Sequence, residues 1–286
     1  MRLNKQTKQK MQQVISEYGV EGTHNFSGVM PKIIEKLGGI GEVKNTDIDT
    51  SIFTNKGKPN EINIIVPNFF DPVRKNSPIL VTKPEEVGST EGSKVLAADM
   101  VISEPVSVSS NVQLNLNGKT ITNTNVQPSG TACPAISVQP GAKLTLSGDG
   151  IVDGGQGGDN SAVMINNNGE ALIEGGTYSV GGDKDGLGNS CIYLTGPNST
   201  LEITGGEYRS LTAYNGKYYV INSTNKNKDT NSIIITGGKF WDFDPSNVDI
   251  EIPAKNYVPE GYKVTSETID DNGKQHIVYT VSKNIA

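Results

Sequence analysis

A motif of eight residues recurs five times between residues 114 and 240, and this internal repeat constrains the fold more than any other feature. Its pattern is apolar, any, apolar, polar, Gly, any, any, apolar. The glycines of the five copies are spaced by 30, 27, 30 and 32 residues: Gly118, Gly148, Gly175, Gly205 and Gly237. A fixed period is typical of a solenoid, in which each coil buries its apolar side chains against its neighbours. We expect one inward column from Leu116, Leu146, Ile173, Ile203 and Ile235.

A second pair of alternating apolar residues precedes each copy, so each coil contains at least two short strands. These pairs are Val106 and Val108, Ile136 and Val138, Val163 and Ile165, Ile192 and Leu194, and Tyr219 and Ile221. Coils stacked about 4.8 Å apart would pair every strand with its equivalent in the next coil. A β-sandwich also has short strands about 8 to 12 residues apart, but it does not predict five matching copies. The sequence therefore predicts an all-β main domain of about five stacked coils over residues 91–250.

The segments on either side of the repeats differ from them. Residues 1–40 carry two apolar patterns at helical spacing, which predict a small helical N-terminal module. The first is Met11, Val14, Ile15 and Tyr18, and the second is Met30, Ile33, Ile34 and Leu37. Residues 41–90 predict a mixed linker region with strands at 62–66 and 78–82. Residues 251–286 predict a β-hairpin around Asn272-Gly273, which would cap the last coil.

Composition and charge exclude several classes of protein. Asp and Glu outnumber Lys and Arg by 31 to 25, giving a net charge of −6, which argues against a nucleic-acid partner. No apolar run approaches the roughly 20 residues of a membrane span, so no membrane partner is predicted. The first residues lack the apolar stretch of a secretory signal peptide. Cys133 and Cys191 fall in strands two coils apart, about 10 Å along the axis, which is too far for a disulfide.

A search for catalytic chemistry finds little. His24 and His276 are the two histidines, and both lie outside the repeats, whereas Arg209 is the one arginine within the coils. Acidic, glycine-rich loops come nearest to a Ca²⁺ site, with Asp149, Asp153 and Asp159 in one, and Asp183 and Asp185 in another. Such loops are more often solvated turns than metal sites. We therefore predict no catalytic residue, no metal and no cofactor.

Aromatic residues are concentrated at the end of the repeats. Seven of the 17 aromatic residues lie between 208 and 243. Tyr208, Tyr219 and Phe240 occupy inward positions of the pattern and are predicted to lie in the core. The other four are predicted to be exposed, and to contact either a neighbouring subunit, which we favour, or a glycan: Tyr214, Tyr218, Trp241 and Phe243.

The coils VQLNLNGKTITNT, KLTLSGDGIVDG and STLEITGGEY resemble those of the right-handed parallel β-helix of the pectate-lyase-like superfamily, over about residues 91–250. With its flanking segments, the chain resembles the fibre, spike and decoration proteins of tailed bacteriophages. This resemblance implies a structural virion protein, most like a head fibre or capsid decoration, that is made in the host cytoplasm. It also implies a homotrimer, docking to a capsid or other virion protein through the N-terminal anchor module, and adhesion to host surface polysaccharide.

Two alternatives of a different class stay open at this point. A polysaccharide-degrading β-helix enzyme, either a lyase or a hydrolase, would require an acidic cleft. A bacterial surface adhesin would require a secretion signal or an anchor. Because the resemblance concerns the fold and not an active site, it does not separate these functions.

Overall fold

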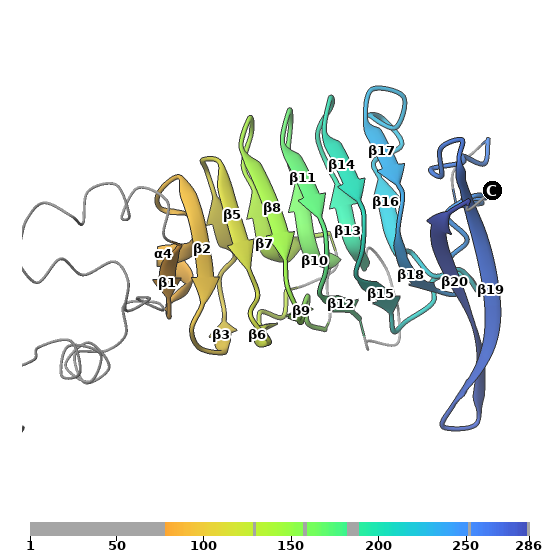
Figure 1. Cartoon of the computed structure of the whole chain (residues 1–286), viewed down its shortest axis with the longest axis horizontal. Helices are drawn as coiled ribbons and strands as arrows, with labels where there is room; N and C mark the ends of the chain where they lie inside the picture. Colours follow the sequence, from red (N-terminus) through yellow and green to blue (C-terminus); the bar gives the residue numbers. More distant parts are fainter. Residues whose placement is uncertain (1–77, 128–129, 157–158, 182–188, 251–252, 285–286) are drawn as a thin grey trace, which may run out of the picture. The chain divides into compact units, whose positions relative to one another are not determined.

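A computed structural model of the chain describes residues 78–127, 130–156, 159–181, 189–250 and 253–284. These residues form a parallel β-solenoid of about four turns, so the predicted β-helix is confirmed (Figure 1). The predicted N-terminal module with its eight apolar residues, and the strand predicted at 62–66, lie outside the described residues. So do Asp183 and Asp185.

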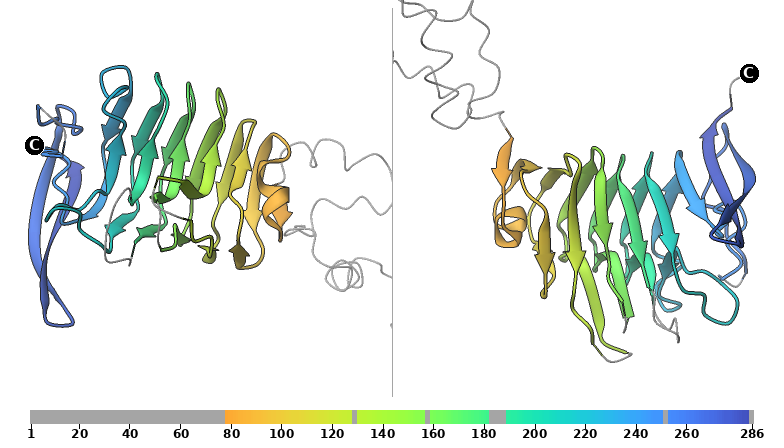
Figure 2. Two further views of the ribbon diagram at one scale, coloured as in Figure 1. Left: turned by 180° about the vertical axis from the view of Figure 1, so that it is seen from behind. Right: turned by 90° about the horizontal axis from the view of Figure 1, so that it is seen from below.

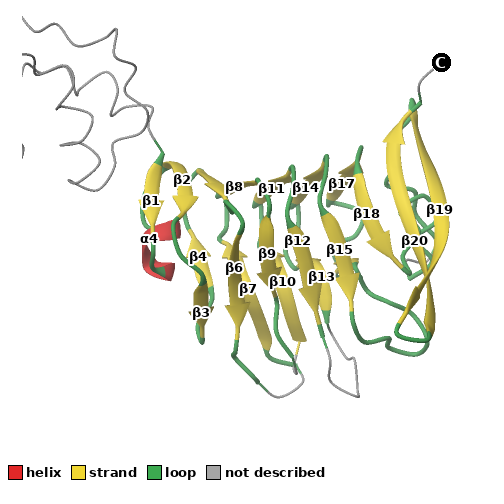
Figure 3. Cartoon of the chain, turned by 60° about the horizontal axis from the view of Figure 1, so that its bottom comes forward, coloured by secondary structure: helices red, strands yellow, loops and turns green. Residues whose placement is uncertain are grey.

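Each complete turn of the solenoid contributes one strand to each of three sheets, and the strands of successive turns pair in parallel; Figures 2 and 3 show the sheets from other directions. Sheet A contains β1 (Ile79–Val81), β2 (Gly92–Leu96), β5 (Val112–Asn115), β8 (Lys143–Ser147), β11 (Glu170–Ile173), β14 (Thr200–Ile203) and β17 (Ser232–Ile235). Sheet C contains β4 (Val106–Val108), β7 (Ala132–Val138), β10 (Asp159–Ile165), β13 (Ser190–Leu194) and β16 (Ile221–Ser223). Sheet B contains β3 (Met100–Ile102), β6 (Lys119–Asn123), β9 (Gly150–Asp153), β12 (Thr177–Val180), β15 (Glu207–Ser210) and β18 (Gly238–Trp241).

The repeat pattern gives the correct register for most of sheet A and the wrong register for its first copy. Leu146, Ile173, Ile203 and Ile235 align across β8, β11, β14 and β17 as predicted. In the first copy, however, Leu114 pairs with Leu146, and Leu116 is buried as predicted but lies just beyond β5, out of the aligned column. Val108 aligns with Val138 and Val112 with Leu144, so the connection between these aligned positions is two residues shorter in the first coil, and this shifts the first copy.

Two further positions differ from the pattern. In the second copy Val152 is buried and aligned with Tyr178, whereas Ile151 is 42% exposed, because the turn before β9 contains one extra residue. In sheet C, Ile192 aligns with Ile221 rather than with Tyr219. Tyr219 is therefore half-buried outside the core. Variable turn lengths cause both errors, since they displace the next strand without changing the alternation within it.

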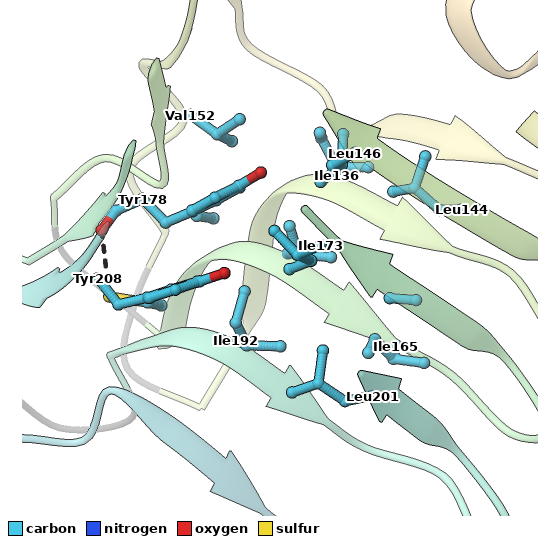
Figure 4. Packing of buried hydrophobic residues seen from close by; sticks show 14 of the residues in the cluster. Ile136, Leu144, Leu146, Val152, Ile165, Ile173, Tyr178, Ile192, Leu201 and Tyr208 are labelled. Atoms are coloured by element: carbon cyan, nitrogen blue, oxygen red, sulfur yellow. Dashed lines mark hydrogen bonds between the residues drawn. The ribbon is translucent and has the colours of Figure 1, made fainter. Parts of the chain in front are cut away.

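The interior is a continuous apolar column with an aromatic stack along sheet B (Figure 4). The Tyr208 ring lies between Tyr178, at 5.1 Å between centroids, and Phe240, at 4.9 Å, with interplanar angles of 10° and 7°. Both tyrosine hydroxyls donate 2.8 Å hydrogen bonds to carbonyls in their own coils, and burial raises the pKa of each. This confirms that Tyr208 and Phe240 belong to the core. Cys133 and Cys191 are buried free thiols, as expected.

The first coil closes with a polar cap. The short helix α4 (Pro84–Gly88) follows β1 and buries Val87 against the solenoid. Lys94 occupies the inward position aligned with Leu114, and its ammonium group donates a 2.7 Å hydrogen bond to the Glu86 carbonyl oxygen. Because β1 and β2 pair within sheet A, the solenoid includes the strand predicted at 78–82 and begins before residue 91.

At the other end, two segments cover the last coil. The predicted hairpin is confirmed as β19 (Tyr262–Asp271) and β20 (Lys274–Lys283), and β20 pairs antiparallel with β18, which extends sheet B only. Residues 242–250 and 253–258 also cover the interior at this end, where Phe243, Val248, Tyr257 and Val258 are buried and the backbone N–H of Ile235 in β17 donates a 2.9 Å hydrogen bond to the Tyr257 carbonyl oxygen. The cap therefore begins near residue 242 and is not made by the hairpin alone.

Candidate binding groove at the C-terminal end

The structure brings together two of the four aromatic residues that were predicted to be exposed. Tyr218 and Trp241 both pack edge-on against His276, with ring centroids 6.4 and 5.7 Å apart. Tyr214 lies apart from them, 6.2 Å from Tyr219. The expectation for Phe243 is wrong, because this side chain is 5% exposed and packs against Phe240 in the core. Phe243 is buried because the chain turns in beneath the last coil after β18.

Trp241 lies on the outer face of sheet B, where Glu207, Arg209 and His276 contact it. Its indole N–H donates a 2.6 Å hydrogen bond to Glu207 Oε1, and the Arg209 guanidinium lies 4.3 Å from the centre of its ring. Arg209 also forms an ion pair with Asp271 at the tip of the hairpin, and this bond lowers the pKa of the Asp271 carboxyl group. Since Arg209 covers the indole ring, Trp241 joins the hairpin to the coils rather than offering a free stacking platform.

A buried histidine and aspartate pair makes a second connection between the hairpin and the last coil. His276 is 5% exposed, and its Nδ1 lies 2.5 Å from Asp242 Oδ2. The other oxygen of Asp242 accepts a 2.9 Å hydrogen bond from the backbone N–H of Ile277. Asp242 has a φ of 52°, a left-handed conformation that Asp tolerates better than most residues. Both carboxylate oxygens therefore hold β20 beside the end of β18.

Next to this pair lies an open groove of about 390 Å³. Its lining comes from three segments that are distant in the sequence, namely the loop after β15, the turn after β18, and β20. The lining residues are Gly216, Lys217, Tyr218, Asp242, Phe243, Asp244, Asn247, Val248, Asp249, Ile277 and Tyr279. Phe243 and Val248 belong to the buried core and provide an apolar base.

Internal bonds fix the polar groups around the groove. The Lys217 ammonium lies 3.0 Å from Asp249 Oδ2 and donates a 2.8 Å bond to the Asp249 carbonyl oxygen, which joins two of the three lining segments. Asp244 Oδ1 accepts hydrogen bonds from the backbone N–H and the hydroxyl of Ser246. Burial, and then the nearby charges of Asp244, Asp242 and Asp249, raise the pKa of Tyr279. Its hydroxyl therefore remains a hydrogen-bond donor at neutral pH.

Among the described residues, no group of three or more His, Cys, Asp or Glu side chains is arranged to hold a metal ion. Asp149, Asp153 and Asp159, which came nearest to a Ca²⁺ site in the sequence, are not brought together into such a group. Asp153 instead accepts a 2.9 Å bond from the backbone of Gly155, as expected for a turn residue.

Sequence reasoning missed most of the residues that build this end of the molecule. His276, Asp242, Arg209, Lys217 and Tyr279 were not candidates, although Arg209 and His276 stood out as rare residue types. That rarity was the one available signal. Position in the sequence could not show that the hairpin returns to the last coil, because His276 and Asp242 are 34 residues apart.

Comparisons with known proteins do not assign the chain to a family. No family model matches the chain, and neither a curated protein nor a solved structure does so. In the part of the chain that the structure describes, no helix has the length and apolar character needed to cross a membrane.

Proposed function

We propose that this chain is a structural protein of a bacteriophage particle, a head fibre or capsid decoration whose β-solenoid is the projecting shaft. The observation that carries the proposal is the filled and capped solenoid, with a continuous apolar interior between the α4 cap and the C-terminal cap. Such a stack is a stiff spacer, because each coil pairs all its strands with its neighbours. The candidate groove then lies at the C-terminal end of the solenoid, opposite the end that begins with β1.

The proposed attachment uses the two amphipathic segments of residues 1–40, and the proposed assembly is a homotrimer. Light scattering of the purified chain tests the assembly, since a trimer has three times the 30.5 kDa chain mass. Deletion of residues 1–40 tests the attachment. We expect the truncated chain to keep its strand signal in far-ultraviolet circular dichroism and to be lost from purified phage particles. A chain that runs as a monomer, or a truncated chain that still co-purifies with capsids at full occupancy, would contradict the proposal.

One observation favours a polysaccharide-degrading enzyme as a second candidate. A histidine held by a carboxylate is a common form of general base, and His276 and Asp242 form such a pair beside the groove. Against this, the carboxylates of the lining would repel an acidic polysaccharide. Incubation with acidic and neutral polysaccharides, followed by assays of new reducing ends and unsaturated products, separates the enzyme from the fibre. Product formation that is lost in His276→Asn would establish the enzyme.

A further inference from the structure

We propose that the groove at the C-terminal end binds one or two sugar units of a neutral saccharide. The inference deepens the adhesive part of the proposed function by naming the site and the ligand class. Its volume of about 390 Å³ lies in the range of small-molecule sites, roughly 300 to 1,000 Å³.

The distribution of apolar and polar groups matches a sugar ring. A pyranose presents C–H groups on its faces and hydroxyl groups around its edge. Phe243 and Val248 close the base of the groove and are 5% and 1% exposed, so the apolar surface open to a ligand comes mainly from Ile277, which is 43% exposed, and from the half-buried Tyr218. The Lys274 ammonium lies 5.3 Å from the centre of the Tyr218 ring, which leaves the other face and the edge of the ring for a ligand. Aromatic and aliphatic surfaces of this kind contact C–H groups, while polar groups at a few positions fix the orientation of the ligand.

Donors and acceptors for hydroxyl groups surround this apolar surface. The Tyr279 hydroxyl is a donor, and the exposed Asn247 offers both a donor and an acceptor. Asp244 and Asp249 each use one carboxylate oxygen in the internal bonds described above, so each has a second oxygen that can accept from a ligand hydroxyl. Sugar hydroxyls both donate and accept, so they can satisfy all of these groups.

Charge decides which saccharides fit. The lining contains three carboxylates, from Asp242, Asp244 and Asp249, against one ammonium group, from Lys217. Lys217 is paired with Asp249, and Asp242 faces His276. The Lys274 ammonium, which contacts the Tyr218 hydroxyl, offsets a second carboxylate and leaves a small excess of negative charge. This excess would repel a uronic acid or a sulfated sugar, whereas a neutral sugar has no such penalty.

The groove is also preorganised. Lys217 links the loop after β15 to the turn after β18, and Asp242 links that turn to β20 through His276 and the Ile277 backbone. On the hairpin side, the Lys274 ammonium donates a 2.6 Å hydrogen bond to the Tyr218 hydroxyl. Because these contacts already hold the lining residues, a ligand would lose little affinity to ordering them.

The test is saturation-transfer NMR on the full chain with four probes: methyl α-D-glucopyranoside, methyl β-D-galactopyranoside, N-acetyl-D-glucosamine and D-galacturonic acid. We expect transfer to at least one neutral sugar and at least fivefold weaker binding of the galacturonate. Tyr218→Ala should weaken the neutral sugar at least tenfold, and Tyr279→Phe about fivefold. Tyr193→Phe is the matched control, because this half-exposed tyrosine of β13 is not part of the lining. It should leave binding unchanged.

Three results would overturn the inference: no transfer to any neutral sugar at 10 mM or so, galacturonate binding as tight as neutral sugar binding, or binding that survives both groove substitutions. Thermal melting of each variant shows whether it is folded. Because Tyr279→Phe removes a single hydroxyl group, it keeps the test informative if Tyr218→Ala unfolds. The measurement uses isolated protein, so a negative result leaves attachment to the particle to be decided by the deletion experiment.

Discussion

The aromatic stack in sheet B offers the sharpest test of how the coils hold together. Tyr208 is fully buried between two parallel rings, and its hydroxyl donates a 2.8 Å bond to the Gly205 carbonyl oxygen. Two substitutions separate these contributions. Tyr208→Phe keeps the stack and removes the hydroxyl, whereas Tyr208→Ala removes the stack and leaves a cavity.

The magnitudes follow from the geometry. Tyr208→Phe leaves a carbonyl oxygen without its donor, which costs about 1 to 2 kcal/mol. Tyr208→Ala creates a cavity in a packed core at a cost of about 3 to 5 kcal/mol, and the loss of two stacked contacts places it near the upper limit, about 5 kcal/mol. For a folded unit of this size about 1 kcal/mol lowers the melting temperature by roughly 2 to 4 °C. We therefore expect decreases of about 2 to 8 °C for Tyr208→Phe and about 10 to 20 °C for Tyr208→Ala.

The assay is thermal and urea denaturation followed by the far-ultraviolet strand signal, with Tyr193→Phe as the control. Tyr193 is a half-exposed tyrosine on β13, so its substitution should change stability by less than about 0.5 kcal/mol. A Tyr208→Ala protein that melts within about 2 °C of the wild type would refute the packing argument. Equal losses for the two Tyr208 variants would show that the hydroxyl group, and not the stack, supplies the stability.

Four further substitutions test other features of the fold. Gly205→Ala should lower the free energy of unfolding by more than about 2 kcal/mol in urea denaturation, since its Cβ would lie 2.3 Å from a carbonyl oxygen of the neighbouring coil. Gly118→Ala should cost only about 1 kcal/mol, because open space surrounds its Cβ and only its φ of +69° is unfavourable. Equal losses for the two variants would contradict the close approach at Gly205. Ser190→Ala should raise the melting temperature, because the buried Ser190 hydroxyl has no hydrogen-bond partner among the residues that the structure describes, and a fall would reveal one. The folded-state pKa of Asp271 lies below its usual 3.8, so the contribution of its ion pair to stability is present above that pH and is lost as the pH falls through the folded value. In Arg209→Gln the carboxyl carbon of Asp271, followed by NMR, should titrate at higher pH, and an unchanged titration would refute the assignment.

The fold could be predicted because the same sequence pattern occurs in five copies. Alternation within a strand decides which side chains face inward, and matching copies about 30 residues apart show that the strands stack. The alignment from Leu146 to Ile235 therefore followed from the pattern. Where a turn changed length the pattern gave a wrong register, as for Leu116 and Tyr219, because turn length is not coded by the alternation of the strands that it joins.

The candidate groove depended on tertiary structure. The sequence by itself determined that aromatic residues are concentrated in and just after the last coils, and that the chain forms a hairpin around Asn272-Gly273. Arg209 and Trp241 are neighbours because they hold equivalent positions of adjacent coils, next to the aligned Tyr208 and Phe240. The sequence did not determine that Phe243 is buried, or that His276 meets Asp242. Phe243, Asp242 and His276 all lie after the last copy of the repeat, so no repeat period relates their positions. Periodic local interactions specify the shaft, whereas contacts made once, between distant segments, specify its end.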